Sequence, residues 1–538
     1  MSISPRRLPI TSATKTKGHR PVNRGMLILD YGSQYTLLIA RKLREIGVYS
    51  EIIDGMSDGP PDDFAFDGLI LSGGPDTVGE SGARSLPGWV LKGAKPVLGI
   101  CYGMQLLVEA LGGKLRSSTL REFGHATLHL AENGQEKGWR MFDKVPRDQV
   151  VWMSHGDDVE AGTSEFLVAG HSDSGCVAAV IHKDRPLIGL QFHPEVQHSA
   201  HGHDLLKGFV VGLCAAPLNW RASSMLDAAL AQVKETVGEG SGKVLMAVSG
   251  GVDSTVAAAL VSRALGPDRV EAVFVDTGLM RKDEVPWVAE NLRRMGARLR
   301  VIESGPRFLK ALEGIEDPEA KRKIIGRLFV EDFEHYAETH KGFTHLGQGT
   351  LYPDVIESAG HGAGAKVIKS HHNVGGLPER LKLALLEPFR YFFKDEVRTV
   401  GEALGIDHDL VHRHPFPGPG LAVRILGAIS EEKVKILQEA DHVFIEALRR
   451  EDLYHKVWQA FAVLLPVKSV GVMGDNRTYQ WTCALRAVVA TDGMTASVGD
   501  LPMPFLVSVA AEIVRKVHGI NRVVYDITTK PPATIEWE

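Results

Sequence analysis

A glycine-rich turn between an apolar strand and a helix constrains this chain more than any other feature. Residues 244–248 are continuously apolar, which is typical of a buried parallel strand, and residues 256–260 favour a helix. Between them lies the sequence SGGVDST. Glycine lets backbone N–H groups approach a ligand closely, and the start of a helix attracts negative charge. The sequence therefore predicts an α/β fold with a phosphate-binding loop at the edge of a parallel sheet.

We assign the seven residues of this loop to ATP binding. They are Ser249, Gly250, Gly251, Val252, Asp253, Ser254 and Thr255. Common nucleotide-binding loops carry a Lys just before the Ser or Thr, whereas this loop has Asp253. A carboxylate repels a bare phosphate, so we expect Asp253 to hold Mg²⁺ against a pyrophosphate group. The pattern SGGxDS resembles the ATP pyrophosphatases, a likeness that implies cleavage between the α and β phosphates and adenylation of a substrate oxygen.

Composition limits the class of protein. A chain of 538 residues is too long to fold around one hydrophobic core. At about 150 residues per domain, its length predicts three or four domains. The formal net charge of −5 argues against a nucleic-acid surface. The four cysteines form no C-x-x-C pair, which favours a reducing compartment. No apolar run reaches the roughly 18 residues of a membrane span. We therefore expect a cytoplasmic enzyme with no membrane or nucleic-acid partner and no tightly bound organic cofactor.

The N-terminal residues are basic. Residues 1–24 contain Lys and Arg but no acidic residue, as in a transit peptide. Because an apolar stripe is missing, a disordered leader over residues 1–23 is the favoured interpretation. We expect a first domain over residues 24–216, in which strand-like and helix-like segments alternate as a parallel sheet requires.

The first domain contains a candidate nucleophile and its base. Strand-like residues 96–100 lead into Cys101, which has a glycine two residues away on each side, as in a nucleophile elbow. Strand-like residues 187–192 lead into His193, with Glu195 able to fix its tautomer. A Cys or a His alone is usually structural, but this combination at strand ends favours a Cys-His-Glu triad. Three neighbouring histidines have metal-like spacing without the ligands that complete a zinc site. These are His198, His201 and His203.

The pattern GxCxGxQ, followed some ninety residues later by HPE, resembles the class I glutamine amidotransferases over about residues 26–213. The resemblance implies a Rossmann-type domain in which the thiolate of Cys101 attacks the side-chain amide of glutamine. Ammonia is released, and water hydrolyses the glutamyl thioester. By the same resemblance, backbone N–H groups of Gly74 and Tyr102 form the oxyanion hole, and Asp157 helps to order glutamine.

The next region, residues 217–415, is expected to form the ATP pyrophosphatase domain. The strand over 270–275 should place its end beside the loop, where we expect adenine. Residues 348–354 are interpreted as a strand that runs to a loop carboxylate. Residues 360–376 contain five glycines around Lys369, and glycine at this density predicts a lid that brings Lys369 to the triphosphate.

Residues 416–538 are expected to form the last domain. Its motifs, together with one from the preceding lid, resemble the glutamine-hydrolysing GMP synthetase family over essentially the whole chain. They are IKSHHNVGGLP, HPFPGPGLAVR, GDNRT and KPPATIEW, in this order. The resemblance implies an amidotransferase domain, an adenine-nucleotide α-hydrolase-like domain and a small α+β C-terminal dimerisation domain. It implies that ATP adenylates the 2-oxygen of xanthosine monophosphate (XMP), that ammonia displaces AMP to give GMP, and that the enzyme is a homodimer.

The same resemblance implies a set of residues that bind XMP. They are Arg322, Asp475, Arg477, Lys530 and Glu536. Arg beside Lys suits a phosphate monoester, and a carboxylate can accept hydrogen bonds from purine or ribose. Two alternatives remain. One is amidation of another adenylated acceptor, as in an NAD synthetase, against which the C-terminal motifs argue. The other is a nucleotide sensor without turnover, against which Cys101 and Asp253 argue.

Overall fold

The structure is a computed structural model that describes residues 20–132, 137–160, 165–358, 383–473, 476–490 and 495–538. Most of the leader and all of the expected lid, with Lys369, lie outside the described residues, as does Asp475. The chain divides into two compact units. The first consists mainly of Arg20–Ala228, and the second contains Ala229–Tyr352 and the described residues after 382. No helix in the described ranges combines the length and the apolar character of a membrane span.

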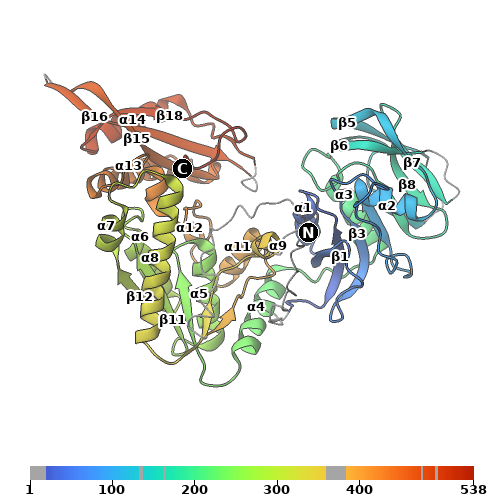
Figure 1. Cartoon of the computed structure of the whole chain (residues 1–538), viewed down its shortest axis with the longest axis horizontal. Helices are drawn as coiled ribbons and strands as arrows, with labels where there is room; N and C mark the ends of the chain where they lie inside the picture. Colours follow the sequence, from blue (N-terminus) through green and yellow to red (C-terminus); the bar gives the residue numbers. More distant parts are fainter. Residues whose placement is uncertain (1–19, 133–136, 161–164, 359–382, 474–475, 491–494) are drawn as a thin grey trace, which may run out of the picture. The chain divides into compact units, whose positions relative to one another are not determined.

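The first unit is built on a nine-stranded sheet in the order β2-β1-β3-β4-β9-β8-β7-β5-β6 (Figure 1). The strands are β1 Arg24–Asp30, β2 Ser50–Asp54, β3 Ala65–Leu71, β4 Val97–Ile100, β5 Leu115–Leu130, β6 Asp148–Val159, β7 Phe166–Ser172, β8 Val177–His182 and β9 Leu187–Leu190. The first five strands in this order, β2, β1, β3, β4 and β9, pair in parallel. The pairs that join β9, β8, β7, β5 and β6 are antiparallel. The α-helices are α1 Thr36–Glu45, α2 Tyr102–Ala110 and α3 Gly202–Lys207.

The order of the parallel strands brings distant segments of the sequence together. Strand β4 lies between β3 and β9, and all four residues of β4 and of β9 are buried. Strands buried on both faces form continuous apolar runs, as the sequence shows. The carboxyl ends of parallel strands meet at one edge of a sheet. The residues that follow β3, β4 and β9 are therefore neighbours, and they include Gly74, Cys101 and His193.

The second unit contains a five-stranded parallel sheet in the order β12-β11-β10-β13-β14. Its strands are β10 Lys243–Val248, β11 Val270–Asp276, β12 Arg298–Glu303, β13 Phe343–Gly347 and β14 Ala384–Leu386. The helices of the second unit include α5 Val252–Leu265, α6 Glu284–Arg294, α7 Gly305–Leu312, α8 Pro318–Thr339, α11 Lys394–Ala403 and α12 His408–Val411. Two further helices, α4 Ala222–Val237 and α9 Tyr352–Ser358, have residues in both units. The glycine-rich loop joins the central strand β10 to α5, as predicted.

One expected strand of this region is wrong. Residues 348–354 do not form a strand, because β13 ends at Gly347 and the helix α9 begins at Tyr352. Pro353 explains the difference. Proline lacks a backbone N–H and is confined to the edges of sheets, whereas the first turn of a helix accommodates it.

The C-terminal residues form a four-stranded sheet within the second unit. The strands are β15 Gln459–Met473, β16 Asn476–Val489, β17 Ser497–Val498 and β18 Ile520–Tyr525, and the long helices are α13 Glu431–Arg450 and α14 Met503–Lys516. One hydrophobic core contains Phe308 and Leu312 of α7 together with Leu437 and Phe444 of α13. The five-stranded sheet, through Val275 of β11, and the C-terminal region therefore share a core.

Arg486 of β16 fixes the C-terminal segment. Its side chain is 1% exposed, and its guanidinium donates to the backbone oxygens of Ile535 (2.8 Å), Thr534 (2.9 Å) and Thr528 (3.0 Å). It also pairs with the carboxylate of Asp526. A segment whose composition is typical of a flexible tail is thus held by four contacts to one cation.

We predict that Arg486→Met detaches the C-terminal segment. Removing one partner of a buried ion pair leaves the other charge unpaired and costs about 3–5 kcal/mol. Backbone amides around residues 530–538 should lose protection from hydrogen exchange, and the protein should unfold at lower temperature. Arg515→Met, an exposed change on α14, is the matched control. Unchanged protection in Arg486→Met would contradict this role.

Candidate active sites

Cys101 occupies a strained turn between β4 and α2. Its φ of 51° and ψ of −109° are rare for a residue with a side chain. The flanking glycines are sterically required. A Cβ on Gly99 would lie 2.5 Å from the Gly103 oxygen, and one on Gly103 would lie 2.4 Å from the Leu71 oxygen. The turn therefore has the geometry of a nucleophile elbow, which places the thiol at the start of a helix, where Cys101 is 7% exposed.

His193 and Glu195 complete the predicted triad. The Nδ1 atom of His193 lies 2.7 Å from Oε1 of Glu195, and both side chains are buried. Burial alone would lower the pKa of His193, but the charge of Glu195 and a hydrogen bond with Cys101 raise that pKa well above its usual value. The carboxylate thus stabilises the protonated form of His193 beside the sulfur of Cys101.

A cavity of about 620 Å³ opens at Cys101. Gly74, Cys101, Tyr102 and Asp157 all line it, so four sequence-predicted residues meet at one surface. A Cβ on the adjacent Gly73 would lie 3.2 Å from Cε1 of His193, which shows how closely the glycine turn approaches the triad. Tyr102 is the first residue of α2, where a backbone N–H has no partner within the helix. The cavity has the components that amide hydrolysis requires.

No role was assigned from the sequence to two glutamines at this site, although Gln105 is the last residue of the GxCxGxQ pattern. The Nε2 atom of Gln191 donates to the sulfur of Cys101 at 3.7 Å, and Nε2 of Gln105 donates to Oε1 of Gln191 at 3.3 Å. Gln105 also lines the cavity and donates to the backbone oxygen of Asp157 at 3.2 Å. Gln191 follows the last residue of β9, and its contact with Cys101 joins residues 90 apart in sequence.

We predict that Glu195→Gln lowers the pKa of His193. The substitution removes the negative charge that raises this pKa and leaves burial, which lowers it. The reaction that depends on Cys101 should slow by about 10⁴-fold, as when the orienting carboxylate of a serine-protease triad is replaced by its amide. Histidine-selective NMR titration measures the pKa directly, and Glu160→Gln, at an exposed position after β6, is the control. An unchanged His193 titration would contradict the assignment.

The glycine-rich loop is shaped by its own hydroxyl groups. Gly250 has a φ of +79°, which favours glycine. The Ser254 hydroxyl donates to the backbone oxygen of Gly251 at 3.1 Å and accepts from the backbone N–H of Ser249 at 3.2 Å. Thr255 also donates to Gly251, at 2.8 Å. Both hydroxyls belong to residues that we assigned to ATP binding, and in this structure they hold the turn.

Asp253 lies in the first turn of α5, directly after the loop. Its side chain is 26% exposed, and Nζ of Lys394 lies 3.9 Å from Oδ2. Mg²⁺ in nucleotide sites is bound by one or two carboxylates together with the phosphates. An accessible carboxylate beside a phosphate-type loop fits that ligand set, and Lys394 adds a cation at the same place.

The residues expected to bind XMP fall into two groups. Glu536 accepts from Arg424 at 2.8 Å and from Gln459 at 2.8 Å. Arg322 donates to the backbone oxygen of Glu538 at 2.6 Å. Lys530 pairs with Ala496 through its backbone, at the edge of the same segment. Glu536 and Arg322 thus both lie near the end of the chain.

Arg477 lies in a different place. It pairs with Val472 near the tip of the β15–β16 hairpin, whereas Glu536 contacts Gln459 at the start of β15. Thirteen residues of extended strand span roughly 40 Å. Within one chain the structure therefore does not bring Arg477 and Glu536 into one site.

Comparison with known proteins matches both parts of the chain. Residues 27–213 match the model of class-I glutamine amidotransferases, residues 225–317 that of NAD synthase, and residues 446–537 that of the GMP synthase C terminal domain. The glutamine-hydrolysing GMP synthase of Thermosipho africanus is 49% identical, covering 95% of this chain and 99% of that protein. This chain belongs to the glutamine-hydrolysing GMP synthase family. The GMP synthases of Aquifex aeolicus and Fusobacterium nucleatum are 48% and 50% identical, each over 96% of this chain and 99% of theirs.

Proposed function

We propose that this chain is a glutamine-dependent GMP synthase, a carbon–nitrogen ligase that uses ATP, XMP and glutamine. The observation that carries the proposal is the match of residues 446–537 to the GMP synthase C terminal domain, because the acceptor distinguishes this reaction from other amidations. The products are GMP, glutamate, AMP and pyrophosphate.

The first half-reaction takes place at the amidotransferase cavity. The sulfur of Cys101 attacks the amide carbon of glutamine, and backbone N–H groups of Gly74 and Tyr102 stabilise the oxyanion. His193 carries the proton that ammonia needs to leave. Water then hydrolyses the thioester to glutamate and regenerates the thiol. Asp157 faces the same cavity and orders the bound glutamine.

The second half-reaction takes place at the glycine-rich loop. Residues 249–255 bind ATP through their backbone N–H groups, and Asp253 is the residue that holds Mg²⁺. When bound, Mg²⁺ neutralises charge on the pyrophosphate that leaves. The 2-oxygen of XMP attacks the α-phosphorus and releases pyrophosphate, and ammonia then attacks carbon 2 and releases AMP. We propose that Arg322, Lys530 and Glu536 bind XMP and that Lys369, outside the described residues, contacts the triphosphate.

A homodimer is supported by the hairpin arm, which we define as residues 468–481 of β15 and β16. Val470, Val472 and Tyr479 are 49%, 74% and 66% exposed, and Val470 pairs with Tyr479, so these side chains share one face. Apolar side chains gathered on one surface indicate a contact with another protein. If Arg477, near this tip, contacts XMP bound near Glu536, it does so from a second copy of the chain. We propose an XMP contact for Asp475 as well, which lies outside the described residues.

We predict that Cys101→Ala separates the two half-reactions. GMP formation from glutamine should be abolished, because no thiol remains to attack the amide. Formation from external ammonium should persist and be faster at alkaline pH, where more ammonia is unprotonated. Asp253→Ala should impair both routes.

Product analysis of the unaltered protein with ATP, Mg²⁺, XMP and glutamine tests the assignment. AMP and pyrophosphate are expected, and ADP with phosphate would overturn it. Loss of the ammonium route in folded Cys101→Ala protein would contradict the division of labour.

We further predict that Val472→Asp weakens dimerisation. A buried carboxylate on an apolar contact face is costly unless it is paired. Sedimentation at micromolar concentration should show a dimer for the unaltered protein and a shift to monomer for the variant. Val301→Asp, which places the same charge on exposed residue 301 of β12, is the control. A monomeric unaltered protein would remove the dimer from the proposal.

A further inference from the structure

A buried arginine holds the backbone of the phosphate loop from the side of the protein core. The guanidinium of Arg413 donates to the backbone oxygen of Gly250 at 2.5 Å and to Oε1 of Glu284 at 2.5 Å. The side chains of Arg413 and Glu284 are 8% and 3% exposed. Arg413 also stacks over the ring of Trp287, 5.3 Å from its centroid. Its position is therefore fixed on three sides.

This contact determines which way the loop presents its amides. A peptide unit is planar and trans, so its oxygen and the following N–H point in opposite directions. Because Arg413 binds the oxygen of Gly250, the N–H of Gly251 must point away from Arg413. That N–H lies on the exposed side of the loop, 3.4 Å from the hydroxyl of Ser249. Phosphate binding at a helix start depends on such N–H groups.

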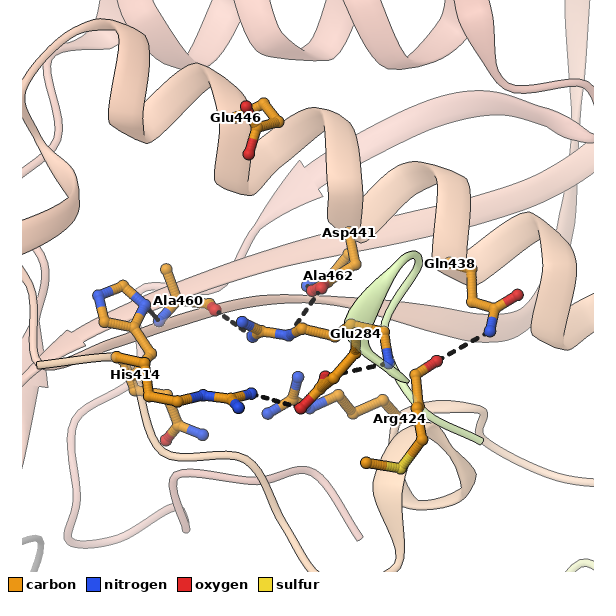
Figure 2. Close-up of polar contacts among 12 residues, drawn as sticks. Glu284, His414, Arg424, Gln438, Asp441, Glu446, Ala460 and Ala462 are labelled. Atoms are coloured by element: carbon orange, nitrogen blue, oxygen red, sulfur yellow. Dashed lines mark hydrogen bonds and ion pairs between the residues drawn. The ribbon is translucent and has the colours of Figure 1, made fainter. Parts of the chain in front are cut away.

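The network continues from Glu284 toward the C-terminal region, as Figure 2 shows. The other oxygen of Glu284 accepts from the backbone N–H of Arg281 at 3.3 Å. The side chain of Arg281 pairs with Asp441 of α13 at 3.0 Å and donates to the backbone oxygen of Ala460 in β15 at 3.2 Å. Asp441 also accepts from the backbone N–H of Ala462 at 3.0 Å. Every link is a hydrogen bond or an ion pair between described residues of one unit.

The far end of the network adjoins Glu536. Ala460 follows Gln459, whose Nε2 donates to Oε1 of Glu536 at 2.8 Å. His414, next to Arg413 in sequence, accepts from the N–H of Ala460 at 3.2 Å and so adds a second connection to β15 (Figure 2). The phosphate loop and the residue proposed to bind XMP are thus joined by polar contacts and by the peptide bond between Gln459 and Ala460.

We infer that Arg413 is a positioning residue for ATP, and that Glu284, Arg281 and Asp441 make its position depend on the region that carries Glu536. The inference rests on the proposed function, since it concerns the loop that binds ATP. Coupling through packed charged groups that share partners produces non-additive effects of substitution.

The first test is Arg413→Lys, assayed by ammonium-dependent GMP formation so that the amidotransferase reaction is not needed. Lysine keeps the charge but lacks the planar fork that reaches both Gly250 and Glu284. We expect kcat/KM for ATP to fall about 10- to 100-fold, as when a reacting group is misplaced by about 1 Å. Arg449→Lys, an exposed change on α13, is the control. Unchanged kcat/KM in Arg413→Lys would overturn the inference. If Arg413→Lys does not fold, the same assay is made with Glu284→Gln, which keeps the shape of the Glu284 side chain.

The second test measures coupling across the network. The variant is Asp441→Asn, because Asp441 is separated from the loop by several contacts of the network. Its control is Glu446→Gln on the same helix. Glu446 makes an exposed ion pair with Arg449 and takes no part in the network (Figure 2). We expect Asp441→Asn to lower kcat/KM for ATP severalfold and Glu446→Gln to leave it unchanged. In the double variant with Arg413→Lys, the loss should be smaller than the product of the two single losses.

Three results separate the possible failures. Multiplicative losses in the double variant, or equal effects of Asp441→Asn and Glu446→Gln, would overturn the coupling. If the unaltered protein forms neither AMP nor GMP, the proposed function fails instead. If the unaltered protein is active and kcat/KM for ATP is unchanged in Arg413→Lys and Asp441→Asn, the inference about Arg413 is wrong and the proposed function stands.

Discussion

Both reaction centres depend on the convergence of parallel strands at one edge of a sheet. In the first unit, β4 lies between β3 and β9, so a glycine turn, a thiol and an imidazole from segments up to about 120 residues apart meet there. In the second unit, β10 lies between β11 and β13 and delivers the phosphate loop. Parallel pairing supplies this edge because every strand ends on the same side. The chemistry is then determined by the few residues that follow each strand.

These turns hold backbone conformations that ordinary sequences avoid. Cys101 and Gly250 both have positive φ, and each is kept in place by neighbours in space. Gly99 and Gly103 allow the backbone to close around Cys101, whereas Arg413 binds the Gly250 oxygen. Strain of this kind persists where the surrounding structure fixes it. The backbone around Cys101 is accommodated by glycines without side chains, whereas the backbone at Gly250 is held by a hydrogen bond from the Arg413 cation.

Local pattern was enough to predict the triad, the loop and most strands, because each is encoded within a few residues of a strand end. The prediction for residues 348–354 failed because apolar residues around Pro353 suit either a strand or a helix, and proline decides between them only in context. Gln191 and Arg413 escaped notice since their roles come from contacts made 90 and 163 residues away. The distance between Arg477 and Glu536 is set by the register of a hairpin, which no motif reveals.

The hydrophobic core shared by α7, α13 and β15 has a consequence for how such a protein can be divided. A break in the polypeptide just before α4, near residue 221, would leave that helix and both sheets whole, so a gene could encode the amidotransferase as a separate subunit. A break near residue 415 would open one core and expose Phe308 and Phe444 to water. Recombination between relatives at the first break leaves both sheets intact, whereas recombination at the second break would expose apolar side chains of the shared core. The C-terminal region must be inherited together with the sheet that binds the nucleotide.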